Sequence, residues 1–196
     1  MHNKVIIIDT ETTGLHPWRN QQPHHEIIEI AMLVINSQQD MQCLLHKKYH
    51  MRRPKQADPV ALKINRYDKE KWDILGTEMT PSAVQEIYDM LNKKDIVLVG
   101  HNVSFDVRFL RTLFTEHNLR WYAPPQIDTR ALARMVWGLE SLSMDTIREH
   151  NGWSVAESHT AMKDAIDSWR IYAEFINRLQ NNPVRKVYEE GTSEVQ

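Results

Sequence analysis

Three segments of this chain carry side chains that could act together on one substrate, and the first reads KVIIIDTETTG at residues 4–14. Its apolar run leads directly into Asp9 and Glu11. Residues two apart on a strand point to the same side, so both carboxylates would face one patch at the end of a buried strand, where α/β sheets bind ligands. Two anions this close repel unless a cation lies between them. Capping of the turn at TTG is the alternative role for this pair.

The other two segments follow a second apolar strand and precede a long helix. Asp106 comes early in the helix after IVLVG and could reach the same sheet edge as Asp9, although the helix dipole also favours an acid there. His159 precedes a helix that contains Asp164, so the loop could turn the imidazole toward that carboxylate. His101 and Asp106 repeat the same spacing where a strand ends, and we expect His101 to be hydrogen-bonded within its turn.

The elements needed to position these side chains are readable from the pattern. Apolar and β-branched residues predict two paired strands at 26–35 and 43–50, beside the first strand. Thr80 and Pro81 cap and start a helix with an apolar stripe that reaches Leu91. Further helices are expected at 58–65, around Phe105–Phe114, and at 128–137, 143–150 and 160–179. This order predicts an α/β fold, a mixed sheet covered by helices.

Length and charge limit the class of protein. We expect one domain over residues 1–180 and a polar, mobile C-terminal tail over 181–196. The net charge of −2 gives no long-range attraction to a polyanion, so nucleic acid would be bound by local contacts. The single cysteine, Cys43, fits a reducing compartment and is expected to be buried. No apolar stretch is long enough for a membrane span, so we expect a soluble, cytoplasmic protein.

The three segments together resemble the motifs of the DEDDh group of 3′-5′ exonucleases, the DnaQ-like proofreading-subunit type within the ribonuclease H-like superfamily. DTETTG at 9–14, HNVSFD at 101–106 and HTAMKD at 159–164 match its three motifs in order and separation. The resemblance implies a ribonuclease H-like fold with a five-stranded mixed sheet. It also implies four metal-binding carboxylates, Asp9, Glu11, Asp106 and Asp164, and the general base His159. A sister group has tyrosine at the last position, so histidine indicates the DEDDh branch.

The chemistry of phosphodiester hydrolysis explains this residue set. The reaction requires an activated water and stabilisation of both the developing anion and the leaving 3′-oxygen. Two divalent ions can supply these, and carboxylate ligands without thiolates favour Mg²⁺ or Mn²⁺. An imidazole, with an ordinary pKa of about 6.5, can take the proton of the water near neutral pH.

Candidate substrate contacts also come from the resemblance. They are Thr12 and Leu15 at the first motif, Ile64 and Asn65 in DPVALKIN, and Asn102 and Phe105 at the second motif. Many relatives have His-Gly where this chain has Asn65-Arg66, which changes the contacts to the base and sugar. Leu15, Ile64 and Phe105 have ordinary core packing as their alternative.

Two further features of the sequence have plain structural interpretations. HKKYHMRRPK at 46–55 is the most basic window and could contact phosphates, but a solvated strand edge protected by lysine explains it equally well. The scattered tryptophans, among them Trp72, Trp121, Trp137, Trp153 and Trp169, are expected to pack in the core.

These observations favour a metal-dependent 3′-5′ exonuclease that acts on single-stranded or frayed DNA 3′ ends and releases nucleoside 5′-monophosphates. An exoribonuclease that trims RNA 3′ ends would use the same five residues and is the first alternative. A module that binds nucleic acid or a polymerase without cutting is the second, and it would be expected to lack a ligand. A DNA polymerase is a candidate partner.

Overall fold

The central feature of the computed structural model, which describes residues 4–36, 40–156 and 158–181, is a mixed sheet of six strands in the order β6-β5-β4-β1-β7-β8. β1 pairs antiparallel with β4 and parallel with β7, so it lies inside the sheet. The strands of this sheet are β1 (Lys4–Thr12), β4 (Ile27–Ile35), β5 (Met41–Tyr49), β6 (Gly76–Thr77), β7 (Ile96–Gly100) and β8 (Gln126–Asp128). A separate hairpin joins β2 (Trp18–Arg19) to β3 (Gln22–Pro23).

The α/β architecture expected from the sequence is confirmed, with one strand more than the five that the resemblance implied. The additional strand is β6, whose two residues pair in parallel with Lys48 and Tyr49 of β5. A strand this short has no periodic pattern from which it could be predicted. The expected pairing of 26–35 with 43–50 is present as the antiparallel β4–β5 pair.

Helices surround the sheet, and their starts follow the predicted caps. Thr80 accepts a hydrogen bond from the backbone N–H of Ala83, and Asp58 accepts one from Val60. Each cap precedes a proline in the first turn of its helix. The helices are η1 (Pro54–Gln56), α1 (Pro59–Ile64), α2 (Lys69–Leu75), α3 (Pro81–Leu91), α4 (Val103–Glu116), α5 (Thr129–Trp137), α6 (Met144–Asn151) and α7 (Ala161–Asn181).

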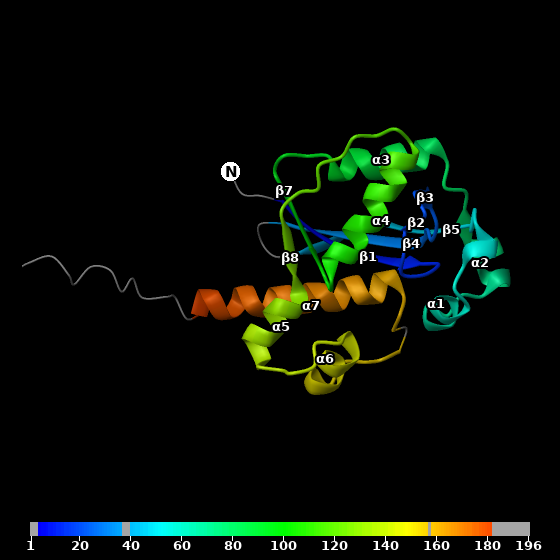
Figure 1. Cartoon of the computed structure of the whole chain (residues 1–196). Coiled ribbons are helices and arrows are strands. Elements are labelled where there is room, and N and C mark those ends of the chain that lie inside the picture. The colour runs from blue at the N-terminus through cyan, green and yellow to red at the C-terminus, as the bar shows by residue number, and fades with distance from the viewer. Residues whose placement is uncertain (1–3, 37–39, 157, 182–196) are drawn as a thin grey trace, which may run out of the picture.

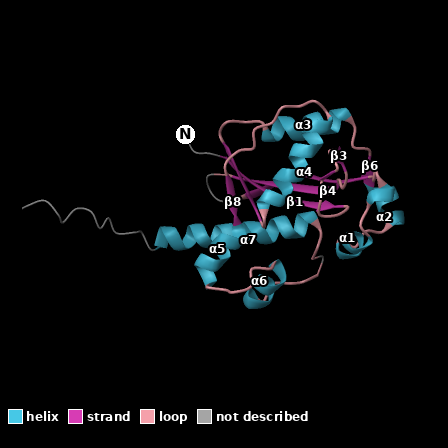
Figure 2. Ribbon diagram, viewed as in Figure 1, coloured by secondary structure: helices cyan, strands magenta, loops and turns pink. Residues whose placement is uncertain are grey.

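The helices form two layers on opposite faces of the sheet. Figure 1 shows α3 and α4 on one face and the long helix α7 on the other, with α5 and α6 packed outside α7. The same layering is visible by element type in Figure 2. Alternate residues of β1 therefore enter different cores: Ile6 and Ile8 pack with α3 and α4, whereas Ile7 packs with Ala161 and Ala165 of α7. This alternation decides which functional side chain faces which layer.

The structure tests the expected burial of Cys43 and of two of the tryptophans. Cys43 is exposed rather than buried, because α7 covers β1, β4 and β7 and leaves the outer strand β5 uncovered on that face. Trp72 and Trp121 are buried as expected. The predicted tail beyond Asn181 lies outside the described residues, as do residues 37–39 between β4 and β5.

None of the helices in the described ranges combines the length and apolar character needed to cross a bilayer.

Candidate active site

Three carboxylates meet at the carboxyl end of β1. Asp9 and Glu11 continue the alternation of Ile7, so they face the layer of α7. Asp164 lies in the first turn of α7 and approaches them from that layer. One oxygen from each of the three side chains lies within 4.8 Å of the others. The same-side geometry expected for the first motif is therefore present, and it extends to the third motif.

These acids oppose one another's ionisation. Burial raises the pKa of Glu11 to about 8, and the charges of Asp164, Glu29 and Asp106 act in the same direction. Burial also raises the pKa of Asp9 well above its ordinary value, with further contributions from Asp106 and Asp164. Burial and mutual repulsion disfavour the ionised form of these carboxylates, so a bound cation would stabilise it. Hard divalent ions prefer carboxylate oxygens.

Asp106 reaches this cluster from the opposite layer. It is buried in the first turn of α4, and its Oδ1 accepts a hydrogen bond of 2.7 Å from Thr10 Oγ1. Thr10 lies between Asp9 and Glu11 on β1 and points to the α4 face. Burial raises the pKa of Asp106 to about 7, although the Thr10 hydroxyl lowers it. Asp106 thus lies near Asp9, but it is held by the strand rather than grouped with the other three carboxylates.

His159 lies on the loop that leads into α7. Its backbone adopts the left-handed region, with φ of 60°, and its side chain is 38% exposed. The ring Nε2 lies 3.9 Å from Oδ2 of Asp145 in α6. Burial raises the pKa of Asp164, and the nearby Arg148 and His159 oppose that rise. An imidazole beside the acids and open to solvent can accept a proton from a water at the site.

The turn after β1 is closed by its threonines and by close packing. Thr12 Oγ1 donates to the carbonyl of Gly14 at 2.8 Å, and Thr13 Oγ1 accepts from the backbone N–H of Glu26. Gly14 is required there, since a Cβ atom would lie 2.5 Å from the ring of His25. The alternative role considered for Asp9 and Glu11 was to cap this turn. The threonine hydroxyls cap it instead.

The candidate substrate contacts differ in how free their side chains are. Leu15 and Ile64 are 62% and 50% exposed, so their alternative as core residues is wrong. Asn65 is buried and its Nδ2 donates to the carbonyl of Thr12 at 2.7 Å, which ties the end of α1 to the first motif. Phe105 packs partly against the main core beside Phe109.

Asn102 and His101 organise the start of α4. Asn102 has a left-handed backbone, with φ of 65°, and its N–H donates to Asp128. His101 is bonded outside its own turn, contrary to expectation: Nδ1 lies 3.0 Å from Thr129 Oγ1 and Nε2 lies 2.8 Å from the carbonyl of Leu142. Burial lowers the pKa of His101, which favours the neutral ring. His101 therefore joins the strand end to the chain segments around α5 and α6.

Arg148, a fully buried charged side chain beside the site, was not predicted from the sequence. Its guanidinium contacts Asp145, Asp164 and Asp167. The signal available in the sequence was its position on the same helix stripe as Met144 and Ile147, which are both buried.

The basic window at 46–55 is largely neutralised by acids. Lys48 contacts Glu29 and lies 4.1 Å from the centre of the Trp72 ring, and Lys47 pairs with Glu86. Arg52 and Arg53 pair with Glu26 and Glu116. Most of these cations already have anionic partners, so the window offers little free positive charge to phosphates.

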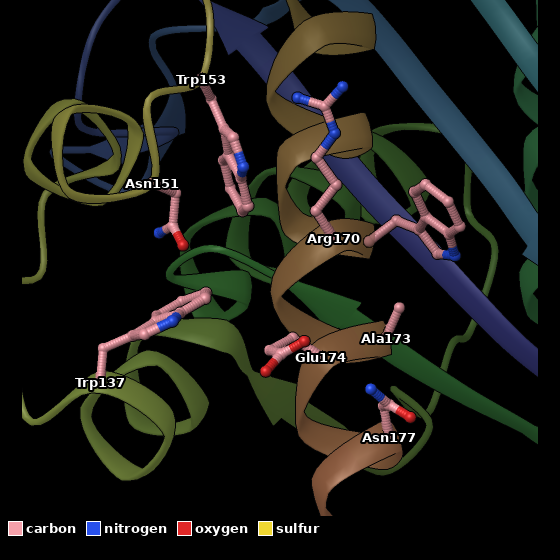
Figure 3. Close-up of a pocket in the computed structure, with 8 residues that line it drawn as sticks. Trp137, Asn151, Trp153, Arg170, Ala173, Glu174 and Asn177 are labelled. Atoms are coloured by element: carbon pink, nitrogen blue, oxygen red, sulfur yellow. The ribbon is translucent and has the colours of Figure 1, made fainter.

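Three tryptophans expected in the core, Trp137, Trp153 and Trp169, pack against the edges of the cores on the α7 side and also border an open hollow beside α7. Trp137 and Trp153 pack edge to face with ring centres 6.1 Å apart, and Trp169 also lines the hollow. Figure 3 shows Trp137, Trp153 and Arg170 around this space of about 550 Å³. All three indoles are partly exposed, because α5, α6 and α7 do not close over them.

Comparison with known families places most of the chain in one family. The family model RNase_T, described as exonuclease, matches residues 6–172, and the chain belongs to this family. The family assignment made from the three motifs is thus confirmed.

Particular relatives are larger proteins. The chain is 29% identical over 192 residues to the PolC-type DNA polymerase III of Thermotoga maritima, covering 94% of this chain and 13% of that protein. It is 24% identical over 179 residues to the 3′-5′ exonuclease DinG of Staphylococcus aureus, covering 91% and 19%. The chain therefore spans less than a fifth of the length of these curated relatives.

The fold is that of a solved exonuclease. E. coli exonuclease I, in complex with a dT13 oligonucleotide, superposes with a TM-score of 0.75 at 16% identity, over 92% of this chain and 43% of the other. A second structure, of exonuclease I without ligand, gives a TM-score of 0.68 at 16% identity, over 91% and 42%.

Proposed function

We propose that this chain is a metal-dependent 3′-5′ exonuclease that removes nucleoside 5′-monophosphates from single-stranded or frayed DNA 3′ ends. The observation that carries the proposal is the approach of Asp9, Glu11 and Asp164 to within 4.8 Å, with Asp106 and His159 beside them. Two relatives, one named as a DNA polymerase III and one as a 3′-5′ exonuclease, support this reaction and favour DNA over RNA as the substrate.

The five motif residues take complementary roles in this proposal. Asp9, Glu11 and Asp164 would hold two divalent ions, Mg²⁺ or Mn²⁺, and Asp106 would complete the ligand set from the α4 side. Bound ions would neutralise the developing anion and lower the pKa of the attacking water. His159 would accept the proton of that water through a ring nitrogen, since its side chain is partly exposed beside Asp164.

The substrate end would be received by apolar side chains next to the acids. Leu15 follows the first motif and Ile64 ends α1, and both are exposed although large and apolar. Apolar side chains in such positions can pack on a base without reading its sequence. Thr12, whose hydroxyl bonds Gly14 within the turn, and Asn65, whose side chain bonds the Thr12 carbonyl, would shape this surface. Asn102 and Phe105 would border it from the start of α4.

A polymerase partner and a cytoplasmic location belong to the same proposal. They are supported by the PolC-type relative and by a single cysteine, which suits a reducing compartment.

The decisive test is digestion of 3′-labelled and 5′-labelled oligonucleotides, as matched DNA and RNA, with Mg²⁺ or with a chelator. We expect the 3′ label to be released as a mononucleotide at once, the 5′-labelled DNA to shorten stepwise, and the chelator to stop both. D9N should abolish digestion while D73N, an exposed acid paired with Lys69, should not. Metal-independent cleavage, or an active D9N, would refute the proposal, and faster digestion of RNA would replace its substrate.

A further inference from the structure

Arg148 of α6 joins three carboxylates from inside the protein. The residue is fully buried, its Nε donates to Asp167 Oδ2 at 2.8 Å, and its Nη1 donates to Asp145 Oδ1 at 3.0 Å. Its Nη2 donates to Asp164 Oδ1, the acid of the third motif. Burial of a guanidinium costs free energy unless the group is fully paired. Because all three nitrogens of Arg148 have partners, the position of its guanidinium is fixed by its contacts.

The fold does not depend on Arg148 to neutralise Asp167. That carboxylate also contacts Lys163 Nζ and lies 3.0 Å from Arg170 Nη1. Asp164 differs, because within the described ranges its salt bridge comes from Arg148. Among the described residues no Arg or Lys other than Arg148 pairs with Asp164, so loss of this contact would leave the candidate metal ligand without such a partner.

Arg148 also fixes the orientation of Asp164. A planar guanidinium holds its partners in set directions, and Arg148 is anchored at its other two nitrogens by Asp145 on its own helix and by Asp167 on α7. With one oxygen held by Arg148, the Asp164 carboxylate lies where an oxygen comes within 4.8 Å of Asp9 and Glu11. Groups that orient metal ligands in this way change metal affinity although they never touch the ion.

We propose that Arg148 is a positioning residue that holds the Asp164 carboxylate in the arrangement required for divalent metal binding. The proposal rests on the metal site of the proposed function. Arg148 itself is buried, so it would act through Asp164 and not by contact with a substrate.

The test is the affinity for Mn²⁺, measured by titration calorimetry without nucleic acid, on the unsubstituted chain and on R148K and R170K. R148K keeps the positive charge but loses the planar guanidinium that pairs with three carboxylates, so the affinity for Mn²⁺ should fall by about 10–100-fold. R170K alters a contact of Asp167 without touching any site acid, and its affinity should not change. At saturating metal, R148K should also lower kcat and leave KM for an oligonucleotide unchanged.

The outcomes separate the proposals. Mn²⁺ binding by R148K that equals or exceeds that of the unsubstituted chain would overturn the positioning role. Absence of Mn²⁺ binding to the unsubstituted chain would refute the metal site, and the positioning role with it. Should R148K not fold, the side-chain N–H resonances of Arg148 in the unsubstituted chain decide. Addition of Mg²⁺ should shift them and not those of Arg170, and no shift would overturn the proposal.

Discussion

Removal of the charge of Glu11 should stabilise the metal-free protein while abolishing its metal-dependent activity. Glu11 is buried at the end of β1 with Asp164, Glu29 and Asp106 acting on it. The folded chain therefore opposes ionisation of this carboxyl unless a cation is present. Glu11→Gln keeps the size and most of the shape of the side chain, but it carries no charge that burial can oppose.

The expected size follows from the pKa of Glu11, which rises from an ordinary 4.5 to about 8. At pH 7 the carboxyl is ionised in the unfolded chain and protonated in the folded one, so folding binds a proton at a cost of about 3 kcal/mol. The cost is absent below about pH 4.5 and grows as pH rises toward 8, because the folded state binds more protons over that interval. E11Q should thus raise the free energy of unfolding by on the order of 3 kcal/mol at pH 7, or about 6–12 °C in Tm.

Thermal unfolding in the presence of a chelator measures this effect. At pH 7 E11Q should melt above the unsubstituted chain, and at pH 5 the difference should fall to about a quarter of its size at pH 7. Addition of Mg²⁺ should raise the Tm of the unsubstituted chain more than that of E11Q, which lacks one ligand. E70Q, a substitution at an exposed position of α2, serves as the control. An E11Q protein that melts at or below the unsubstituted chain at pH 7 in chelator would contradict the account of the site.

Three further predictions concern the base, the strand and the surface. H159A should slow hydrolysis by about 10²–10⁴-fold with Mn²⁺ binding retained, and an unchanged single-turnover rate would place the base elsewhere. T10V should lower the free energy of unfolding by about 1–3 kcal/mol in denaturant titrations, because the buried Asp106 loses its donor, whereas exposed T115V should not. The cations of 46–55 are largely paired, so the affinity of the D9N variant for single-stranded DNA should depend only weakly on salt. The logarithm of the binding constant, measured by anisotropy titration, should fall against the logarithm of the salt concentration with a slope no steeper than about −2. A steeper slope would reveal a basic surface elsewhere.

Local patterns in the sequence predicted the four longest strands of the sheet, most of the helices and the family, but not the short strands β6 and β8. The apolar run before Asp9 and the cap at Thr80 each report on a few neighbouring residues, and the structure places both as expected. The order and spacing of the three motifs identified the family, which the family model confirms. The roles of the individual site residues remain predictions that the proposed experiments address.

Features that depend on contacts between distant segments were not predictable in this way. Arg148 contacts Asp164 through the packing of α6 on α7, and no local pattern encodes that pairing. His101 was assigned to its own turn, although its partners lie 28 and 41 residues away. The exposure of Cys43 likewise depends on how far α7 extends across the sheet, which its own neighbours in the sequence do not specify.

The site combines side chains from a strand inside the sheet with side chains from a loop and a helix end, and these two parts differ in how easily their backbones can move. Asp9 and Glu11 pair with Ala31 and Glu29 of β4. The first part of the same strand, Lys4–Ile7, pairs with β7 as well, so amide exchange in that part should require opening of the whole sheet. His159 and Asp164 are carried instead by a loop and the first turn of a helix, on a backbone that has no strand on either side. An inhibitor or a partner that alters the site without unfolding the protein would therefore act by shifting α7 and the loop before it relative to β1, which stays paired with β4.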